Sequence, residues 1–180
     1  MVFDAAEFSA DVARILSLDG GGMRLMPLAS GSCSSAEARR LLSAADASKL
    51  FPGARAPEAA LSGLWLYFSC LDESHSVSQS ITTAEGSFWH GIMHRQEPDP
   101  GNAAYWFRRV GRHPILPALC EEAASLGYPS GEAWDPFAFI DFVEAARRRR
   151  GSAEEWLALD VQRVEWQLLF RHCALPGGPR

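Results

Sequence analysis

The sequence has no apolar run long enough to cross a membrane. The longest, residues 61–71, is interrupted by two serines and a glycine and is well short of the roughly 20 residues that a membrane-spanning helix needs. The first residues carry acidic side chains where a secretory signal would carry basic ones. We therefore expect a buried helix over 61–71, no membrane association and a cytoplasmic location.

Cysteine is scarce, and its spacing matches neither a zinc-binding motif nor a disulfide-rich scaffold. The four cysteines, at positions 33, 70, 120 and 173, lie far apart and form no C-x-x-C pair. Cys70 and Cys120 lie in apolar stretches, where cysteine commonly acts as a small core residue. The spacing predicts reduced thiols without a catalytic role.

Lysine is almost absent, since Lys49 is the only one, and acidic residues outnumber basic ones by 22 to 17. The net charge of −5 disfavours binding to nucleic acid or to an anionic membrane surface, which needs concentrated positive potential. Four arginines at 147–150 are explained by a solvated helix C-terminus, which the helix dipole favours. We expect a small polar molecule as partner and no nucleic acid; the sequence sets no oligomeric state.

Convincing strand patterns are also missing, whereas helical periodicity recurs along the chain. A length of 180 residues suits a single domain. The sequence therefore predicts a mainly α fold, a single helical domain over 1–180 of about seven helices, with a flexible tail at 176–180. Serines alternate with other residues near 74–81, and this pattern predicts a short strand or an ordered loop.

Several of the predicted helices have recognisable starts. The Asp-Pro pair at 135–136 is an N-cap followed by proline, and Ser152 with Glu155 forms a capping-box pattern. Thr82 with Glu85 gives the same pattern for a helix that carries two histidines. The expected helices cover approximately residues 4–16, 35–50, 57–71, 82–97, 102–110, 114–126, 136–150 and the segment from 152 onward.

The segment 85–113 holds three of the five histidines of the chain. On a helix, His90 and His94 are about one turn apart, a spacing that lets both imidazoles reach one metal ion, and Glu97 continues the same face. These three residues are the predicted ligands of one divalent metal ion, although the glutamate that activates water in an H-E-x-x-H motif is absent. Further ligands must come from other elements, with His75, Glu73, Asp99 and His113 as the candidates.

Without a metal, His90 and His94 are candidate catalytic acids or bases, because imidazole titrates near neutral pH. Arg95 and Arg109 would then neutralise an anionic ligand, since guanidinium groups match carboxylate and phosphate oxygens. Two more side chains would orient that ligand, Asn102 and Tyr105. The predicted pocket is lined by His75, His90, His94, Arg95, Tyr105, Arg109 and His113.

Each of these patterns has a structural alternative. The arginines can pair with the carboxylates of the same segment in an ion-pair network. The aromatic residues Trp89, Trp106 and Phe107, at helical spacing, fit a core better than a stacking platform for a sugar ring.

Residues 16–24, L-S-L-D-G-G-G-M-R, resemble the glycine-rich oxyanion segment of patatin-like lipases. Those enzymes also carry a serine in a G-x-S-x-G turn, which the sequence G-S-C-S-S at 31–35 does not supply. We interpret the three glycines as a helix stop and a flexible loop.

A longer resemblance covers residues 72–114. The blocks F-W-H-G-I-M-H-R-Q-E-P-D and N-A-A-Y-W-F-R-R-V-G-R-H-P resemble a family of uncharacterised bacterial proteins with relatives in eukaryotes. No activity is established for that family, so the resemblance implies only that this chain is of the same kind. It assigns no catalytic residue.

Two functions follow from these patterns. The first is an enzyme or binding protein whose histidine and arginine cluster at 75–113 takes a small anionic or sugar-like ligand, with metal-assisted hydrolysis as the reaction. The second is a non-catalytic interaction or scaffold module in which the same cluster holds helices together.

Overall fold

The computed structural model describes residues 2–177, and all regular structure within them is helical, as predicted. There are ten α-helices, more than expected, and two short 3₁₀ helices. They are η1 (Ala5–Glu7), α1 (Ala10–Ser17), η2 (Gly20–Gly22), α2 (Ala36–Ser43), α3 (Ala47–Leu50), α4 (Pro57–Tyr67), α5 (Leu71–Ser78), α6 (Ala84–Gln96), α7 (Pro100–Val110), α8 (Leu116–Ser125), α9 (Pro136–Arg147) and α10 (Ala153–Ala174). No helix in this range is both long and apolar enough to span a membrane. The predicted tail at 176–180 lies largely outside the described residues.

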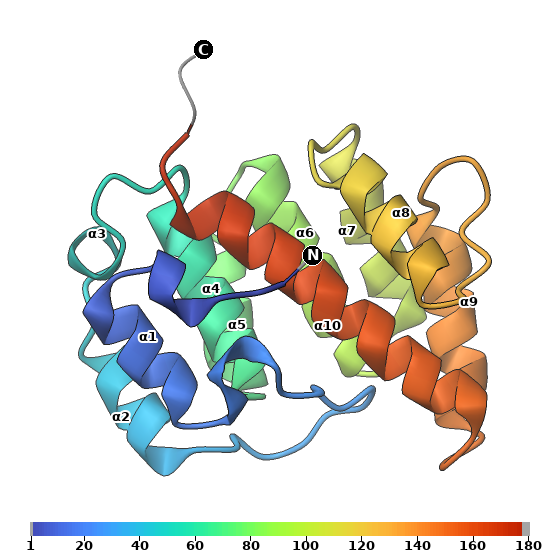
Figure 1. The fold of residues 1–180 in the computed structure, drawn as a ribbon, viewed down its shortest axis with the longest axis horizontal. Helices are drawn as coiled ribbons and strands as arrows, with labels where there is room; N and C mark the ends of the chain where they lie inside the picture. The colour runs from blue at the N-terminus through green and yellow to red at the C-terminus, as the bar shows by residue number, and fades with distance from the viewer. Residues whose placement is uncertain (1, 178–180) are drawn as a thin grey trace.

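The long C-terminal helix α10 lies across the front of the molecule, with α4, α5, α6 and α7 behind it (Figure 1). Helices α1, α2 and α3 lie at one end, and α8 and α9 lie at the other. Trp166 of α10 is fully buried, and its indole N–H donates to the carbonyl oxygen of Gly63 in α4 at 2.8 Å. The buried apolar side chains from both ends form one continuous core around α10.

Helices α6 and α7 form a hairpin, and α6 is buried along its length, from Gly86 to Gln96. Asp99 caps α7 by accepting a hydrogen bond from the backbone N–H of Asn102 at 3.0 Å. Because Pro100 directly follows this cap, α7 begins two residues earlier than the sequence indicated. Within the hairpin, α6 is therefore almost fully enclosed, and it contacts both α5 and α10.

The segment near 74–81 was wrongly expected to be a strand or loop, because its residues up to Ser78 belong to α5. Its serines are compatible with a helix because their hydroxyl groups bond to nearby carbonyl oxygens. Ser76 donates to Asp72 at 2.8 Å, and buried Ser74 bonds across to Ser62 of α4. The alternating serines of this segment are therefore explained by hydrogen bonds of their hydroxyl groups within and between helices.

Two helix starts also differ from expectation. The helix expected over 35–50 is divided, because Asp46 caps α3 by accepting from the backbone N–H groups of Ser48 and Lys49. The predicted capping box at Thr82 and Glu85 does not form, since the N-cap is the next residue and Glu85 faces two histidines instead. The caps predicted at residues 135 and 152 are confirmed.

Cys33 and Cys70 form a disulfide, which corrects the expectation of reduced thiols at these positions. The bond joins the loop before α2 to the start of α5. Cys120 is free and buried, as expected of a core residue, and Cys173 is free and buried as well. The pairing is a tertiary contact between residues 37 positions apart, which sequence spacing does not reveal.

The glycine run forms the ordered turn η2 rather than a flexible loop. The hydroxyl oxygen of Tyr67 accepts from the backbone N–H groups of Gly22 and Arg24 at 3.0 and 3.1 Å. Gly22 has a φ of 90°, and a Cβ there would lie 2.1 Å from the ring of Phe3. Glycine is therefore required at this position by packing and by backbone conformation.

Gly91 permits the close approach of α6 and α7, and we expect Gly91→Ala to destabilise the protein by about 1–3 kcal/mol. A Cβ there would lie 2.9 Å from the buried ring of Phe107. Urea denaturation measures the change. The matched control is Gly101→Ala on the exposed side of α7, which alanine's helix propensity should stabilise by up to about 1 kcal/mol. Equal stability of the Gly91→Ala variant and the wild type would contradict this packing argument.

Candidate functional site

The five histidines of the chain gather at two separate places in the fold. In each place, three residues offer one potential ligand atom apiece, and these atoms lie within 4.8 Å of one another. The first cluster consists of His75, His90 and His94, and the second cluster consists of Glu85, His113 and His172.

The first cluster combines two helices. Helix α6 places His90 and His94 side by side, with ring centroids 4.8 Å apart, as their spacing predicted. Helix α5 brings His75 to within 4.6 Å of the His90 ring and 5.6 Å of the His94 ring, measured between centroids. His75 was a candidate ligand in the sequence, and its place in a helix beside α6 gives the cluster its third imidazole.

The surroundings of His90 favour one tautomer. Its Nδ1 lies 3.0 Å from Oγ of Ser78, and that hydroxyl is also placed to donate to the carbonyl oxygen of His75 at 3.3 Å. Because a hydroxyl has one proton, Ser78 then accepts from an Nδ1–H group of His90. This leaves a lone pair on Nε2, the atom through which such an imidazole binds a metal.

A carboxylate lies behind His94 in the same way. Oε2 of Glu97 is 3.0 Å from Nδ1 of His94, within ion-pair distance although the contact lacks hydrogen-bond geometry. Glu97 was predicted as a metal ligand, but it lies at Nδ1 of His94 and is absent from the group of converging ligand atoms. Its position suits a residue that orients a ligand.

Burial keeps the imidazoles of α6 in the neutral form that binds metals. His90 is 2% exposed and His94 is 8% exposed. Burial lowers the pKa of His90 from 6.5 to about 3, and the proximity of His94 and His75 adds to the effect. Burial also lowers the pKa of His94, although Glu97 and Asp99 oppose that shift.

Helix α7 covers one side of the first cluster. The ring of Trp106 lies against His90, with centroids 4.0 Å apart and the ring planes tilted by 35°. The guanidinium group of Arg109 lies 5.3 Å from the Trp106 ring and 5.9 Å from the ring of Tyr105, which is 48% exposed. Arg109 makes no ion pair within residues 2–177, so its charge remains available to an anion.

Three of the predicted ligand-binding residues have other partners. Arg95 is fully buried and pairs with Glu165 of α10, so it does not line an open pocket. The side-chain amide of Asn102 donates to the carboxylate of Asp99 at 2.7 Å, and His113 lies in the second cluster. The structure therefore divides the pocket expected over 75–113 into two sites and a buried ion pair.

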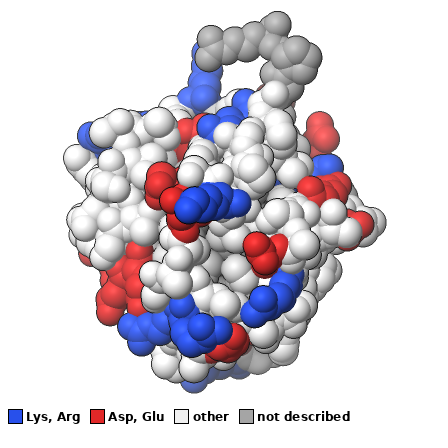
Figure 2. Space-filling view, turned by 90° about the vertical axis from the view of Figure 1, so that its left-hand side faces the viewer, with Lys and Arg blue, Asp and Glu red and all other residues white. Residues whose placement is uncertain are grey.

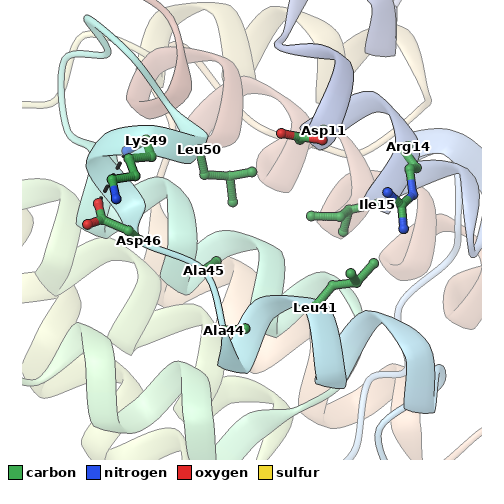
Figure 3. Close-up of a pocket in the computed structure, with 9 residues that line it drawn as sticks. All are labelled: Asp11, Arg14, Ile15, Leu41, Ala44, Ala45, Asp46, Lys49 and Leu50. Atoms are coloured by element: carbon green, nitrogen blue, oxygen red, sulfur yellow. Dashed lines mark hydrogen bonds between the residues drawn. The ribbon is translucent and has the colours of Figure 1, made fainter.

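Two surface hollows help to place the first cluster. A polar hollow of about 310 Å³ is lined by Glu97, by residues 30–33 and by residues 69–73, so it reaches the carboxylate behind His94. Another hollow, of about 360 Å³, lies between α1, α2 and α3 (Figure 3), and none of its lining residues belongs to a histidine cluster. The end of the molecule formed by these three helices carries basic and acidic side chains next to one another (Figure 2).

The second cluster joins three distant segments. Glu85 lies in the first turn of α6, His113 in the loop before α8, and His172 in the last turn of α10. Oε1 of Glu85 is 3.4 Å from Nε2 of His172 and 3.8 Å from Nε2 of His113. The contacts with His113 and His172 lower the pKa of Glu85, which keeps its carboxylate ionised. His172 was missed in the sequence because no local spacing links it to the other two.

No protein-family model, curated protein or solved structure matches the chain. The resemblance of residues 72–114 to uncharacterised proteins stays a prediction, so the case for function is made from the geometry of the two clusters.

The buried ion pair supports a first prediction for this region. Glu165→Leu should destabilise the protein by about 3–5 kcal/mol, because Arg95 is left charged and unpaired in the core. The double variant Arg95→Met, Glu165→Leu removes both charges and should recover most of that loss. Chemical denaturation of the three proteins measures the difference. A double variant less stable than Glu165→Leu would contradict a purely structural role for Arg95.

The low pKa of His90 makes stability depend on pH. In the unfolded chain His90 takes up a proton near pH 6.5, whereas in the folded protein it does so only near pH 3. Stability is therefore lost as the pH falls from about 6.5 towards 3. His90→Asn, whose amide can still donate to Ser78, should lose less stability over this range in chelator-treated protein. Parallel curves of melting temperature against pH for variant and wild type would contradict the assignment.

Proposed function

We propose that the first cluster binds a divalent transition-metal ion, with zinc as the reference metal, and that the ion activates water for hydrolysis. The observation that carries the proposal is the convergence of three imidazoles while Ser78 and Glu97 face Nδ1 of the two from α6. Partners behind a histidine fix the tautomer that binds a metal. Neutral imidazole is also a preferred zinc ligand.

The ligand atoms of the first cluster have to move only slightly closer together to bind one zinc ion. Ligands at 2.0–2.1 Å from a tetrahedral zinc ion are about 3.4 Å apart, and the present atoms lie within 4.8 Å. The ring nitrogens of His75 make no hydrogen bond within residues 2–177, so this half-buried imidazole is able to turn towards the other two. Rotation of His75 brings the three nitrogens towards one ion.

Three neutral imidazole ligands do not reduce the double positive charge of the ion. They also leave the fourth position of a tetrahedral site open to a water molecule. A zinc ion in such a site lowers the pKa of bound water to about 7, which makes a hydroxide nucleophile available at neutral pH. Arg109 provides a positive charge beside Trp106 without an ion-pair partner in the described part of the chain, which suits an anionic substrate. The polar hollow at Glu97 is lined by carboxylates that can accept hydrogen bonds from the hydroxyl groups of a sugar. These surroundings support a small anionic or sugar-like substrate.

The alternative function is a non-catalytic scaffold or interaction module. The near-complete burial of His90 and His94 and the contact of the Trp106 ring with His90 favour it. In this function the cluster only joins α5 to α6.

The test is zinc content and hydrolysis of chelator-treated, zinc-reloaded full-length protein. We expect the variant with His90→Ala and His94→Ala to bind one equivalent fewer than wild type by inductively coupled plasma mass spectrometry. Hydrolysis of p-nitrophenyl phosphate, acetate or β-glucoside should fall by roughly 100-fold or more in this variant. His172→Gln, which alters only the second cluster, should keep the hydrolysis.

A second variant tests the substrate class. Arg109→Gln should raise KM for p-nitrophenyl phosphate by roughly 10-fold, because a charged hydrogen-bond donor is lost, and leave zinc content unchanged. Equal zinc content in wild type and the double histidine variant would contradict the metal site. If the double histidine variant binds one equivalent of zinc fewer but wild type hydrolyses none of the probes, the first cluster binds a metal without catalysing hydrolysis. That result would support the scaffold function.

A further inference from the structure

The second cluster has ligand chemistry of its own. Two imidazoles and a carboxylate are a common ligand set for zinc and for iron(II). The residues come from the start of α6, the loop before α8 and the end of α10, and none is shared with the first cluster. The two sites can therefore be tested separately.

The spacing in the second cluster is that of metal ligands. Glu85 Oε1 lies 3.4 Å from Nε2 of His172 and 3.8 Å from Nε2 of His113. Good hydrogen bonds to nitrogen span about 2.7–3.2 Å, whereas ligands of one tetrahedral zinc ion are about 3.4 Å apart. All three ligand atoms lie within 4.8 Å of one another, so a modest contraction would bring them to the distances of one ion.

An unsatisfied group points into the same space. His113 is only 4% exposed, and its Nε2 has no hydrogen-bond partner although it faces Glu85. A buried polar atom without a partner is unfavourable. A ligand between the three side chains would satisfy it.

One hydrogen bond of His113 opposes metal binding, because it determines which ring nitrogen carries the proton in the absence of metal. The backbone N–H of Ile115 donates to Nδ1 of His113 at 3.4 Å, so the neutral ring carries its proton on Nε2 without metal. Zinc would take the Nε2 lone pair, the ring proton would move to Nδ1 through solvent, and this long hydrogen bond would be lost. Because the bond is at the limit of hydrogen-bond distance, its loss is a small opposing effect.

We propose that Glu85, His113 and His172 form a second, structural zinc site that fixes the C-terminal turn of α10 to the α6–α7 hairpin. The site closes a connection between residues 87 positions apart in the chain. Its role is to stabilise the fold, and it does not depend on catalysis at the first cluster.

The experiment is a zinc titration of the chelator-treated full chain, followed by metal analysis and thermal melting. Wild type should bind two equivalents, and the variant with His90→Ala and His94→Ala should bind one. Two variants each remove one ligand of the second site: His172→Gln keeps a polar side chain beside Glu85, and His113→Asn keeps an acceptor for Ile115. Each should also bind one equivalent.

Thermal melting separates this site from the first cluster. Excess zinc should raise the melting temperature of the double alanine variant, in which only the second site remains, by roughly 5–10 °C. The same excess of zinc should raise the melting temperature clearly less in the triple variant that also carries His172→Gln. Unchanged zinc content and unchanged melting shifts in both His172→Gln and His113→Asn would overturn the second site and leave the first untouched. Loss of zinc only on His90→Ala and His94→Ala would overturn the second site as well.

Discussion

The burial of α6 is the constraint on which the rest of the structure depends. From Gly86 to Gln96 every residue of this helix is buried, although several of them are polar or ionisable. Polar groups inside a protein need partners, because an unpaired one is strongly unfavourable. Neighbouring helices supply partners for two of these side chains: α5 brings Ser78 to His90, and α10 brings Glu165 to Arg95.

Both histidine clusters follow from this arrangement. Glu85 at the start of α6 meets the end of α10, and the two histidines further along α6 meet α5. One helix thus contributes residues to both clusters and joins them through its backbone. The buried pair between Arg95 and Glu165 fixes the same helix to α10 from a third direction. Binding at either cluster would therefore stabilise the packing of the whole hairpin.

The sequence predicted those features that depend on local spacing. The helical class, the caps at residues 135 and 152, and the neighbouring positions of His90 and His94 all follow from residues a few positions apart. Arg95 was assigned to the pocket because its guanidinium group suits an anionic ligand, yet it follows His94 directly, and adjacent residues on a helix point about 100° apart. That geometry turns Arg95 towards α10 and away from the histidines.

The remaining features arise from tertiary contacts. The disulfide of Cys33 with Cys70, the pairing of Arg95 with a residue 70 positions away, and the approach of His172 to Glu85 leave no local pattern. The helix α5 was obscured because serine is compatible with helix, strand and loop, and its hydroxyl groups bond to whichever carbonyl is near. The position of His75 in the first cluster depended on that helix.

The most direct test of the metal site in the first cluster is anomalous diffraction at the zinc absorption edge from crystals of zinc-loaded, full-length protein. We expect an anomalous peak about 2.0–2.1 Å from Nε2 of His90 and of His94 and from one ring nitrogen of His75. Density for a water molecule at the fourth position would complete the site. Full zinc loading in solution with no anomalous peak between these three imidazoles would contradict the central claim.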